Sequence, residues 1–312
     1  MVEAINLTKT YGINRGVQNV SFQIESGEIV GLVGLNGAGK TTIMKILAGY
    51  MPPTGGEANI DGISMIDNPR EASKKIGFLT EIPALYDEMV VEEFLMFLAG
   101  IRGIKKKERK EHIDGIMKKC IIADVSQRLI RNLSKGYRQR VGFAQALVGS
   151  PSVLIFDEPT AGLDPKQTTE VRTLIKKLSE NHTIIISSHI LTEISAICEK
   201  VIIINEGELV LDRQISELSN KDKDNLLLRV RADFDKIQSI LSGIKGVLEI
   251  IPKEHVDEYA EVLVTTNAGL KVRENIFSAC SKAALPIVEM RSTRETLEDL
   301  FLRLTIPRKG AK

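Results

Sequence analysis

The chain has 312 residues, 43% of them hydrophobic, and this length is enough to bury a sizeable core in about two domains. Its 42 basic and 41 acidic residues give a formal net charge of +1, so no overall field favours nucleic acid or an anionic lipid surface as a partner. The three cysteines are scattered without CxxC spacing, which argues against a disulfide or metal framework and for reduced thiols in a cytosolic setting.

We expect neither a signal peptide nor a membrane-spanning segment. No signal peptide precedes the first predicted strand, and no apolar run approaches the roughly 20 residues that a bilayer requires. The longest candidate, residues 89–101, is interrupted by Glu92 and Glu93.

Residues 2–80 are predicted to be rich in strands and to contain a phosphate-binding loop, GLNGAGKTT, directly after the apolar stretch 28–33. A buried strand, a glycine-rich loop and a helix together direct several backbone N–H groups at one point. Lys40 can then reach the β- and γ-phosphates, and the Thr41 hydroxyl can bind Mg²⁺. A chance match is the alternative, and the flanking strand and helix argue against it. The predicted cradle consists of Gly34, Leu35, Asn36, Gly37, Ala38, Gly39, Lys40, Thr41 and Thr42.

Residues 81–150 are predicted to be helical. Near the end of this region, LSKGYRQR at 133–140 begins a helix for which Ser134 is a suitable N-cap. A serine hydroxyl and free N–H groups at a helix start favour an anion, although an ordinary capped helix explains the segment when it is taken alone. The helical spacing rests on the apolar residues Phe94, Leu95, Phe97 and Leu98.

Residues 151–218 are predicted to alternate strands and helices, beginning with four apolar residues and two carboxylates at 153–158. This pattern is typical of a buried parallel strand with acids at its C-terminal end. Asp157 suits Mg²⁺ through a water, and Glu158 can polarise an attacking water. An Asp-Glu pair before a proline is more often a turn, but the hydrophobic strand before it reverses that expectation.

The remaining chain is predicted to be a separate module after a charged linker at 219–225. From 226 to 312 the pattern indicates strand, helix, strand, strand, helix and strand, the βαββαβ order of a small α+β ferredoxin-like fold. A last helix follows, and its apolar residues form one stripe for packing. This stripe consists of Leu297, Leu300, Phe301 and Leu304.

The order of these motifs resembles the ATP-binding-cassette (ABC) ATPases over roughly the first 215 residues. The phosphate loop is followed by LSKGY at 133–137, the acidic strand, AGLD at 161–164, and His189 after an apolar run. The chain looks most similar to the ATPase subunits of type-2 ABC exporters, which include drug, lipid, polysaccharide and gliding-related systems. The resemblance implies an α/β P-loop NTPase cassette at 1–218, with its helical subdomain inserted at 81–150.

The resemblance also assigns roles to single residues. It gives Tyr11 the role of stacking on adenine, and the alternative is a strand-end aromatic in the core. Glu81 stands where the family usually has a glutamine that touches Mg²⁺ and senses the membrane partner, and a carboxylate can still bind the metal. His189 matches the switch histidine that reaches the γ-phosphate as a hydrogen-bond donor, whereas a lone histidine after an apolar strand is more often structural.

The signature segment departs from the commonest family pattern, LSGGQ. Lys135 and Tyr137 replace a glycine and a glutamine, while Ser134 and Gly136 keep the positions that contact phosphate, and Asp164 is assigned to the nucleotide site with them. In the family, the signature of one subunit completes the site of another, so two ATP molecules lie between two cassettes. A single cassette per chain implies a two-fold homodimer.

We interpret the protein as a Mg²⁺-dependent ATPase subunit that powers transport, with export as the expected direction. It would lie on the cytoplasmic face of the membrane through a separately encoded permease, with no nucleic-acid partner. Apolar Leu85, Tyr86 and Met89 form a groove for a permease helix or, alternatively, pack internally.

The alternatives are a soluble ABC ATPase of translation or DNA repair and a non-hydrolysing regulatory subunit. Translation members usually carry two cassettes and repair members carry long heptad insertions, and neither pattern occurs in this sequence. The set Lys40, Asp157, Glu158 and His189 argues against a subunit that does not hydrolyse ATP.

Overall fold

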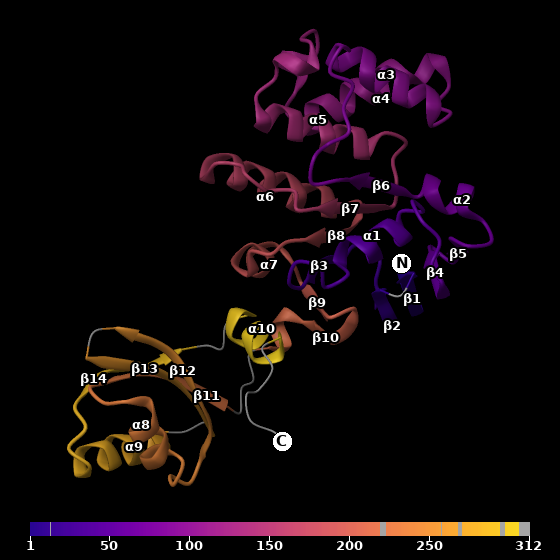
Figure 1. Cartoon of the computed structure of the whole chain (residues 1–312). Coiled ribbons are helices and arrows are strands. Elements are labelled where there is room, and N and C mark those ends of the chain that lie inside the picture. The colour runs from indigo at the N-terminus through magenta and orange to yellow at the C-terminus, as the bar shows by residue number, and fades with distance from the viewer. Residues whose placement is uncertain (13, 219–222, 257, 268–269, 294–296, 306–312) are drawn as a thin grey trace. The chain divides into compact units, whose positions relative to one another are not determined.

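In the computed structural model, the chain divides into two compact units, Met1–Ile215 with Leu304–Lys312, and Ser216–Arg303. The structure describes all residues except 13, 219–222, 257, 268–269, 294–296 and 306–312. Figure 1 shows the elements of both units. Within the described residues, no helix combines the length and the apolar character that crossing a membrane requires.

The first unit is built on a six-stranded sheet in the order β10-β9-β3-β8-β7-β6. Strands β9, β3, β8, β7 and β6 are parallel, and β10 is antiparallel to β9. All residues of β3, β7 and β8 are buried, as expected for the middle strands of a parallel sheet that is covered on both faces. The bounds are β3 (Ile29–Val33), β6 (Ile76–Leu79), β7 (Val153–Asp157), β8 (Thr183–Ser187), β9 (Lys200–Asn205) and β10 (Glu208–Gln214).

The carboxyl ends of the parallel strands meet at one edge of this sheet, and this edge positions the site. The phosphate loop leaves β3, Glu81 follows β6, Asp157 ends β7, and His189 follows β8. In open α/β sheets, ligands bind at such an edge, outside the carboxyl ends of the strands. The helices next to these strands are α1 (Lys40–Leu47), α6 (Pro165–Ser179) and α7 (Leu191–Ile197).

A second, antiparallel sheet of four strands has the order β2-β1-β4-β5 and shares a core with α1. Its central strand β1 ends at Tyr11, which brings this residue to the phosphate loop. Helix α2 leads from this sheet into β6. The bounds are β1 (Val2–Tyr11), β2 (Asn14–Ile24), β4 (Gly55–Ile60), β5 (Ile63–Ser64) and α2 (Pro69–Lys74).

Between β6 and β7 the chain forms a group of helices, as predicted from the apolar spacing in this region (Figure 1). Phe94 and Leu95, which share one face of α3, are buried, whereas Phe97 is 45% exposed. The bounds are α3 (Val91–Ile101), α4 (Lys106–Lys119) and α5 (Lys135–Leu147), with short 3₁₀ turns at Ala123–Val125 and Ile130–Asn132.

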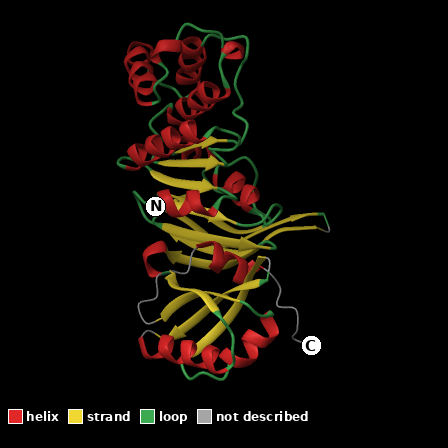
Figure 2. Cartoon of the chain, turned by 90° about the vertical axis from the view of Figure 1, so that its left-hand side faces the viewer, coloured by secondary structure: helices red, strands yellow, loops and turns green. Residues whose placement is uncertain are grey.

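The second unit has the predicted element order and a four-stranded antiparallel sheet in the order β12-β13-β11-β14. This is the strand order of a ferredoxin-like fold. Figure 2 shows helices α8 and α9 against this sheet. Strand β11 begins at Lys223, within the stretch predicted as a linker. The bounds are β11 (Lys223–Val230), α8 (Phe234–Leu241), β12 (Val247–Val256), β13 (Tyr259–Asn267), α9 (Leu270–Lys282) and β14 (Ile287–Thr293).

In the last helix, α10 (Leu297–Thr305), the predicted apolar stripe is largely buried. Leu297, Leu300 and Phe301 are buried, and Leu304 is half-buried. Ion pairs from Asp299 to Lys253 and from Arg303 to Glu249 tie this helix to β12.

Candidate nucleotide site

A cavity of about 360 Å³ lies at the carboxyl edge of the six-stranded sheet. The end of β1, the phosphate loop, the start of α1, the segment after β6 and the end of β7 all contribute to it. These elements are far apart in the sequence, yet the structure brings most of the predicted site residues to this one place. The lining consists of Tyr11, Gly16, Asn36, Gly37, Gly39, Lys40, Thr41, Thr42, Glu81, Asp157 and Glu158.

The phosphate loop curls tightly before α1. Gly37 and Gly39 have φ values of 82° and 108°, which side chains other than glycine rarely adopt. At Gly39, a Cβ atom would also lie 2.7 Å from the carbonyl oxygen of Gly16. Helix α1 begins at Lys40 without a side-chain cap, so the positive end of its dipole and its free N–H groups are available to an anion.

The Lys40 side chain lies inside this loop. It is 7% exposed, and its Nζ donates hydrogen bonds to the carbonyl oxygens of Gly34 at 2.7 Å and Leu35 at 3.2 Å. Burial lowers the pKa of Lys40, while the negative charges of Glu158 and Asp157 act in the opposite direction. The ammonium is therefore placed between the loop and the two carboxylates, where it can meet a phosphate.

Asp157 is held on both sides of its carboxylate. Its Oδ2 accepts a hydrogen bond from Thr41 Oγ1 at 3.3 Å, and its Oδ1 accepts one from Ser187 Oγ at 2.6 Å. The hydroxyl of Thr41 and the carboxylate of Asp157 are oxygen ligands of the kind that Mg²⁺ prefers, and Glu81 adds a second carboxylate to the cavity. The residues present therefore fit a magnesium ion at this position.

Glu158 and His189 form a contact at the edge of the cavity. His189 Nδ1 lies 2.9 Å from Glu158 Oε2, and the two side chains are 59% and 14% exposed. Glu158 has a φ of 48°, an uncommon value for a residue with a side chain. Its carboxylate is partly buried and oriented by an imidazole, as a group that polarises a water needs to be.

Tyr11 lies at the rim of the cavity and not in the core. Its side chain is 45% exposed, and its hydroxyl lies 3.3 Å from Thr42 Oγ1 and donates to Met51 Sδ at 3.2 Å. Gly16 permits this position, because a Cβ atom there would lie 2.7 Å from the tyrosine ring. The alternative of a strand-end aromatic in the core is therefore wrong, and the tyrosine side chain lines the cavity.

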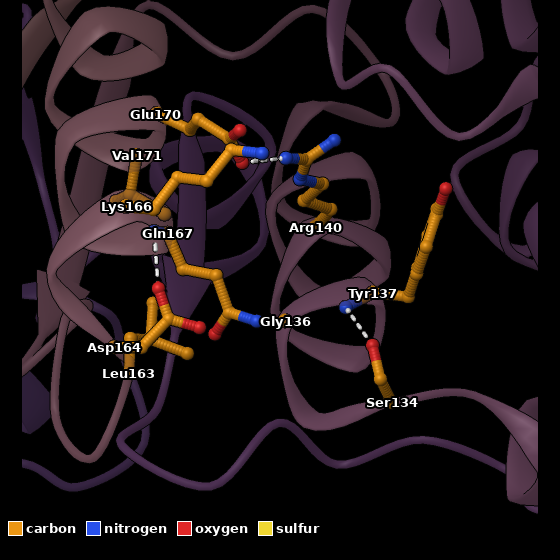
Figure 3. A pocket seen from close by; sticks show the side chains of 10 residues that line it. All are labelled: Ser134, Gly136, Tyr137, Arg140, Leu163, Asp164, Lys166, Gln167, Glu170 and Val171. Atoms are coloured by element: carbon orange, nitrogen blue, oxygen red, sulfur yellow. Dashed lines mark hydrogen bonds and ion pairs between the residues drawn. The ribbon is translucent and has the colours of Figure 1, made fainter.

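Among the predicted site residues, Gly34, Leu35, Ala38 and His189 lie outside the lining of the first cavity. Ser134, Gly136 and Asp164 line a second cavity of about 320 Å³ between α5 and α6 (Figure 3). Ser134 caps α5 by accepting from the Tyr137 N–H at 3.4 Å, and Asp164 caps α6 by accepting from the Gln167 N–H at 2.8 Å. Within one chain, these residues thus line a different cavity from the phosphate loop.

Tyr137, at the position of the usual signature glutamine, faces the helical group. Its hydroxyl donates to Asp124 Oδ2 at 2.7 Å, and the Arg140 guanidinium lies 5.7 Å from its ring centroid. Arg140 also pairs with Glu170 across the second cavity (Figure 3). The tyrosine therefore serves to fix α5, and its hydroxyl is already engaged.

Two residues of this site were missed in the sequence, Gly16 and Ser187. Ser187 ends the apolar run two residues before His189. If this run is paired in register with 153–157, Ser187 lies beside Asp157, and that pairing could have identified it as a site residue. Gly16 carries no local motif, and its contact with Tyr11 and Gly39 depends on how β1 and β2 pair.

The fold and this site define a P-loop ATPase of the cassette type. Residues 17–161 match the family described as ABC transporter. The ABC transporter ATP-binding protein YxlF of Bacillus subtilis is 30% identical, and the match covers 97% of this chain and 99% of that protein. The bacitracin transport ATP-binding protein BcrA of Bacillus licheniformis is 31% identical, with 97% of each chain covered.

A solved structure of another ATP-binding cassette has a similar fold. The ATP-binding cassette MJ0796, in a dimeric post-hydrolysis state bound to ADP and Pi, has a TM-score of 0.63 and 28% identity, covering 69% of this chain and 99% of that one. The chain belongs to the ABC transporter ATP-binding proteins. It is an ATP-binding subunit of an exporter-like transporter, and its reaction is Mg²⁺-dependent hydrolysis of ATP.

Proposed function

We propose that this chain drives the export of a peptide-antibiotic-like compound by clamping two ATP molecules against a second copy of itself. The observation that carries the ATP-driven part is the single cavity that collects the phosphate loop, Lys40, Asp157 and Glu158. The similarity to BcrA over 97% of both chains supports the class of cargo.

In this proposal each lining residue has one task. Tyr11 stacks on the adenine, the N–H groups at the start of α1 and Lys40 hold the phosphates, and Glu158 orients the attacking water. A magnesium ion held by Thr41 and Asp157, with Glu81 beside it, would neutralise charge on the phosphates. His189 Nδ1 lies against the Glu158 carboxylate, and in this proposal the imidazole donates a hydrogen bond to the γ-phosphate when ATP is bound.

A second copy of the chain is needed because the signature residues lie in another cavity. Ser134 and Gly136 stand at the N-terminus of α5, an arrangement that suits a phosphate, but their cavity does not include the phosphate loop. Two chains related by a two-fold axis would place each signature on the nucleotide of the other chain, which satisfies both sites with one interface.

The permease contact in this proposal involves exposed apolar side chains of the segment after Glu81 and of α3, where the rings of Tyr86 and Phe97 lie 6.1 Å apart. The exposed residues are Ile82, Tyr86, Phe97 and Ile101. These side chains are 81%, 56%, 45% and 67% exposed. Of the three residues predicted to form a groove or to pack internally, Tyr86 is exposed, which agrees with the groove. Leu85 and Met89 are half-buried, which agrees in part with internal packing. An exposed apolar patch suits a cytoplasmic helix of a membrane partner, which would hold the chain at the cytoplasmic face.

The proposal is tested by expressing the chain with candidate permeases that have six predicted membrane helices, in a strain that is sensitive to bacitracin. We expect resistance to rise with the wild type and not with Glu158→Gln, because export needs hydrolysis. Resistance that is equally high with both chains would contradict an ATP-driven exporter. ATPase activity without a change in resistance would retain the enzyme and reject this cargo.

A further inference from the structure

The strands β7 and β8 end side by side at the site, and their last residues face each other. The two strands are parallel, and Asp157 is paired in register with Ser187. Ser187 is completely buried, on the strand that leads to His189. A buried hydroxyl needs hydrogen-bond partners, and the partners of Ser187 are Asp157 and Glu158.

The Ser187 hydroxyl uses its donor and an acceptor position on two neighbouring residues. It donates to Asp157 Oδ1 at 2.6 Å, and it accepts from the backbone N–H of Glu158 at 2.9 Å. The second oxygen of Asp157 accepts from Thr41. The carboxylate is therefore held at both oxygens, and the plane that it presents to the cavity is set by Ser187 and Thr41 together.

The backbone of Glu158 makes the second contact important. Its φ of 48° lies in the left-handed region, which is unfavourable for a residue with a Cβ atom and persists only where the surroundings enforce it. Glu158 is the first residue after β7, so its backbone N–H has no partner in the sheet ladder. The hydrogen bond to the Ser187 hydroxyl satisfies this donor. The same turn points the Glu158 side chain to His189.

We propose that Ser187 is the positioning residue for both carboxylates of the site, setting the orientation of Asp157 through its donor and the turn of Glu158 through its acceptor. This inference rests on the proposed nucleotide site. Catalytic groups must be held close to the productive geometry, and a small displacement of either carboxylate would weaken metal binding or misplace the attacking water.

The test compares two buried hydroxyls of the same strand. Ser187→Ala removes the hydroxyl at the site, and Thr183→Val removes the one at the other end of β8, where Thr183 Oγ1 accepts from the Gly27 N–H at 3.0 Å. Both changes leave a backbone N–H without its partner, so we expect similar losses of thermal stability. A merely structural hydroxyl at Ser187 would therefore behave like Thr183.

We expect Ser187→Ala to lower kcat for ATP hydrolysis by about 10- to 100-fold, the usual value of a hydrogen bond to a charged group. The Mg²⁺ concentration for half-maximal activity should rise, because Asp157 loses one of its two restraints. The affinity for ATP without Mg²⁺, which depends on the phosphate loop, should change by less than about twofold, and Thr183→Val should match the wild type in all three measurements.

Equal kinetics for Ser187→Ala and Thr183→Val would overturn the inference and leave the ATPase intact. If Ser187→Ala does not fold, Ser187→Cys keeps the approximate size and weakens both hydrogen bonds, and it must show the same shift in Mg²⁺ dependence. A wild-type chain that neither binds nor hydrolyses Mg·ATP would instead overturn the proposed function.

Discussion

Burial and charge act against each other at Lys40. Its side chain is 7% exposed, which disfavours the ammonium, and burial is the largest effect on its pKa. The carboxylates of Glu158 and Asp157 and the two loop carbonyls favour the charged form. When a phosphate binds, its oxygens can replace the carbonyl oxygens of Gly34 and Leu35 as hydrogen-bond acceptors for the ammonium. The free-energy cost of breaking the two existing hydrogen bonds is therefore small.

Lys40→Ala should therefore weaken ATP binding. Loss of one charge-assisted contact at a buried site costs about 1.5–3 kcal/mol, or roughly 10- to 150-fold in affinity. Titration with a fluorescent ATP analogue measures this directly. Lys45→Ala, which removes a lysine from the last turn of the same helix, is the matched control and should keep the wild-type affinity. Unchanged binding by Lys40→Ala would remove this residue from the site.

The sequence predicts residues well where their task is local. The phosphate loop and the acids after 153–156 are contiguous, so their types and spacing suffice to recognise them. Ser187 and Gly16 act through contacts across paired strands, and the register of those pairs does not follow from one strand alone. The rim position of Tyr11 has the same origin, because it depends on where β1 ends relative to the loop.

At the scale of elements, the two helix starts that line the second cavity support the proposal that the signature acts on the nucleotide of a partner chain. Helices α5 and α6 are capped by Ser134 and Asp164, and neither has an acidic residue in its first turn. Lys135 and Lys166 instead stand at these positive helix ends, an arrangement that an anion from outside would stabilise. The apolar runs that became buried strands were predictable. The juxtaposition of α5 with α6 was not, because β7 separates the two helices in the chain and their starts meet only in the folded structure.

Mixing two inactive variants tests whether Ser134 serves the opposite chain. Lys40→Ala damages the phosphate loop, and Ser134→Arg places a large side chain at the signature. A heterodimer then has one site with both defects and one site with neither, so ATPase activity should partly return. If heterodimers form and activity stays absent, either both sites must act together or the signature does not serve the partner.

His182, immediately before β8, gives a pH-dependent contribution to stability. It is buried, and its Nδ1 lies 2.7 Å from the Pro151 carbonyl oxygen. Burial is the largest effect and lowers the pKa of His182 below the ordinary value of 6.5. The unfolded chain therefore takes up a proton at higher pH than the folded chain, and the free energy of unfolding should fall as the pH drops below about 6.5.

Thermal melting of the wild type and of His182→Asn at pH values of about 7.5 and 5.5 measures this contribution. Asparagine keeps a donor for the Pro151 carbonyl and does not titrate, so the variant should lose less stability on acidification than the wild type. An equal loss in both proteins would assign the acid sensitivity to other groups, such as His112, whose pKa burial also lowers.

At the scale of the whole molecule, each unit has its own apolar core. In the second unit, Leu226, Leu228 and Val262 of the sheet pack with Ile237 and Ile276 of the helices, without help from the cassette. This separation was predictable, because every element of the unit is local in sequence and ordered as βαββαβ. Its consequence is that two different parts of the chain are available to hold a dimer, the nucleotide sites and the second unit.

The Glu158→Gln variant distinguishes these two possibilities. Glutamine keeps the size of the side chain and much of its hydrogen bonding but removes the negative charge that polarises the water, so turnover should fall by roughly 10²–10⁴ while Mg·ATP still binds. Bound ATP that is not hydrolysed should hold two cassettes together. We therefore expect a stable dimer of the variant in Mg·ATP, measured by light scattering, with phosphate release measured in the same samples.

The wild type in Mg·ADP serves as the control for this experiment, because without the γ-phosphate the signature of the opposite chain has no contact to make. We expect it to be monomeric. Wild-type turnover in Glu158→Gln would show that this carboxylate does not act on the water. A dimer that forms equally with ATP, with ADP and without nucleotide would instead place the dimer contact in the second unit, whose core is complete without the nucleotide.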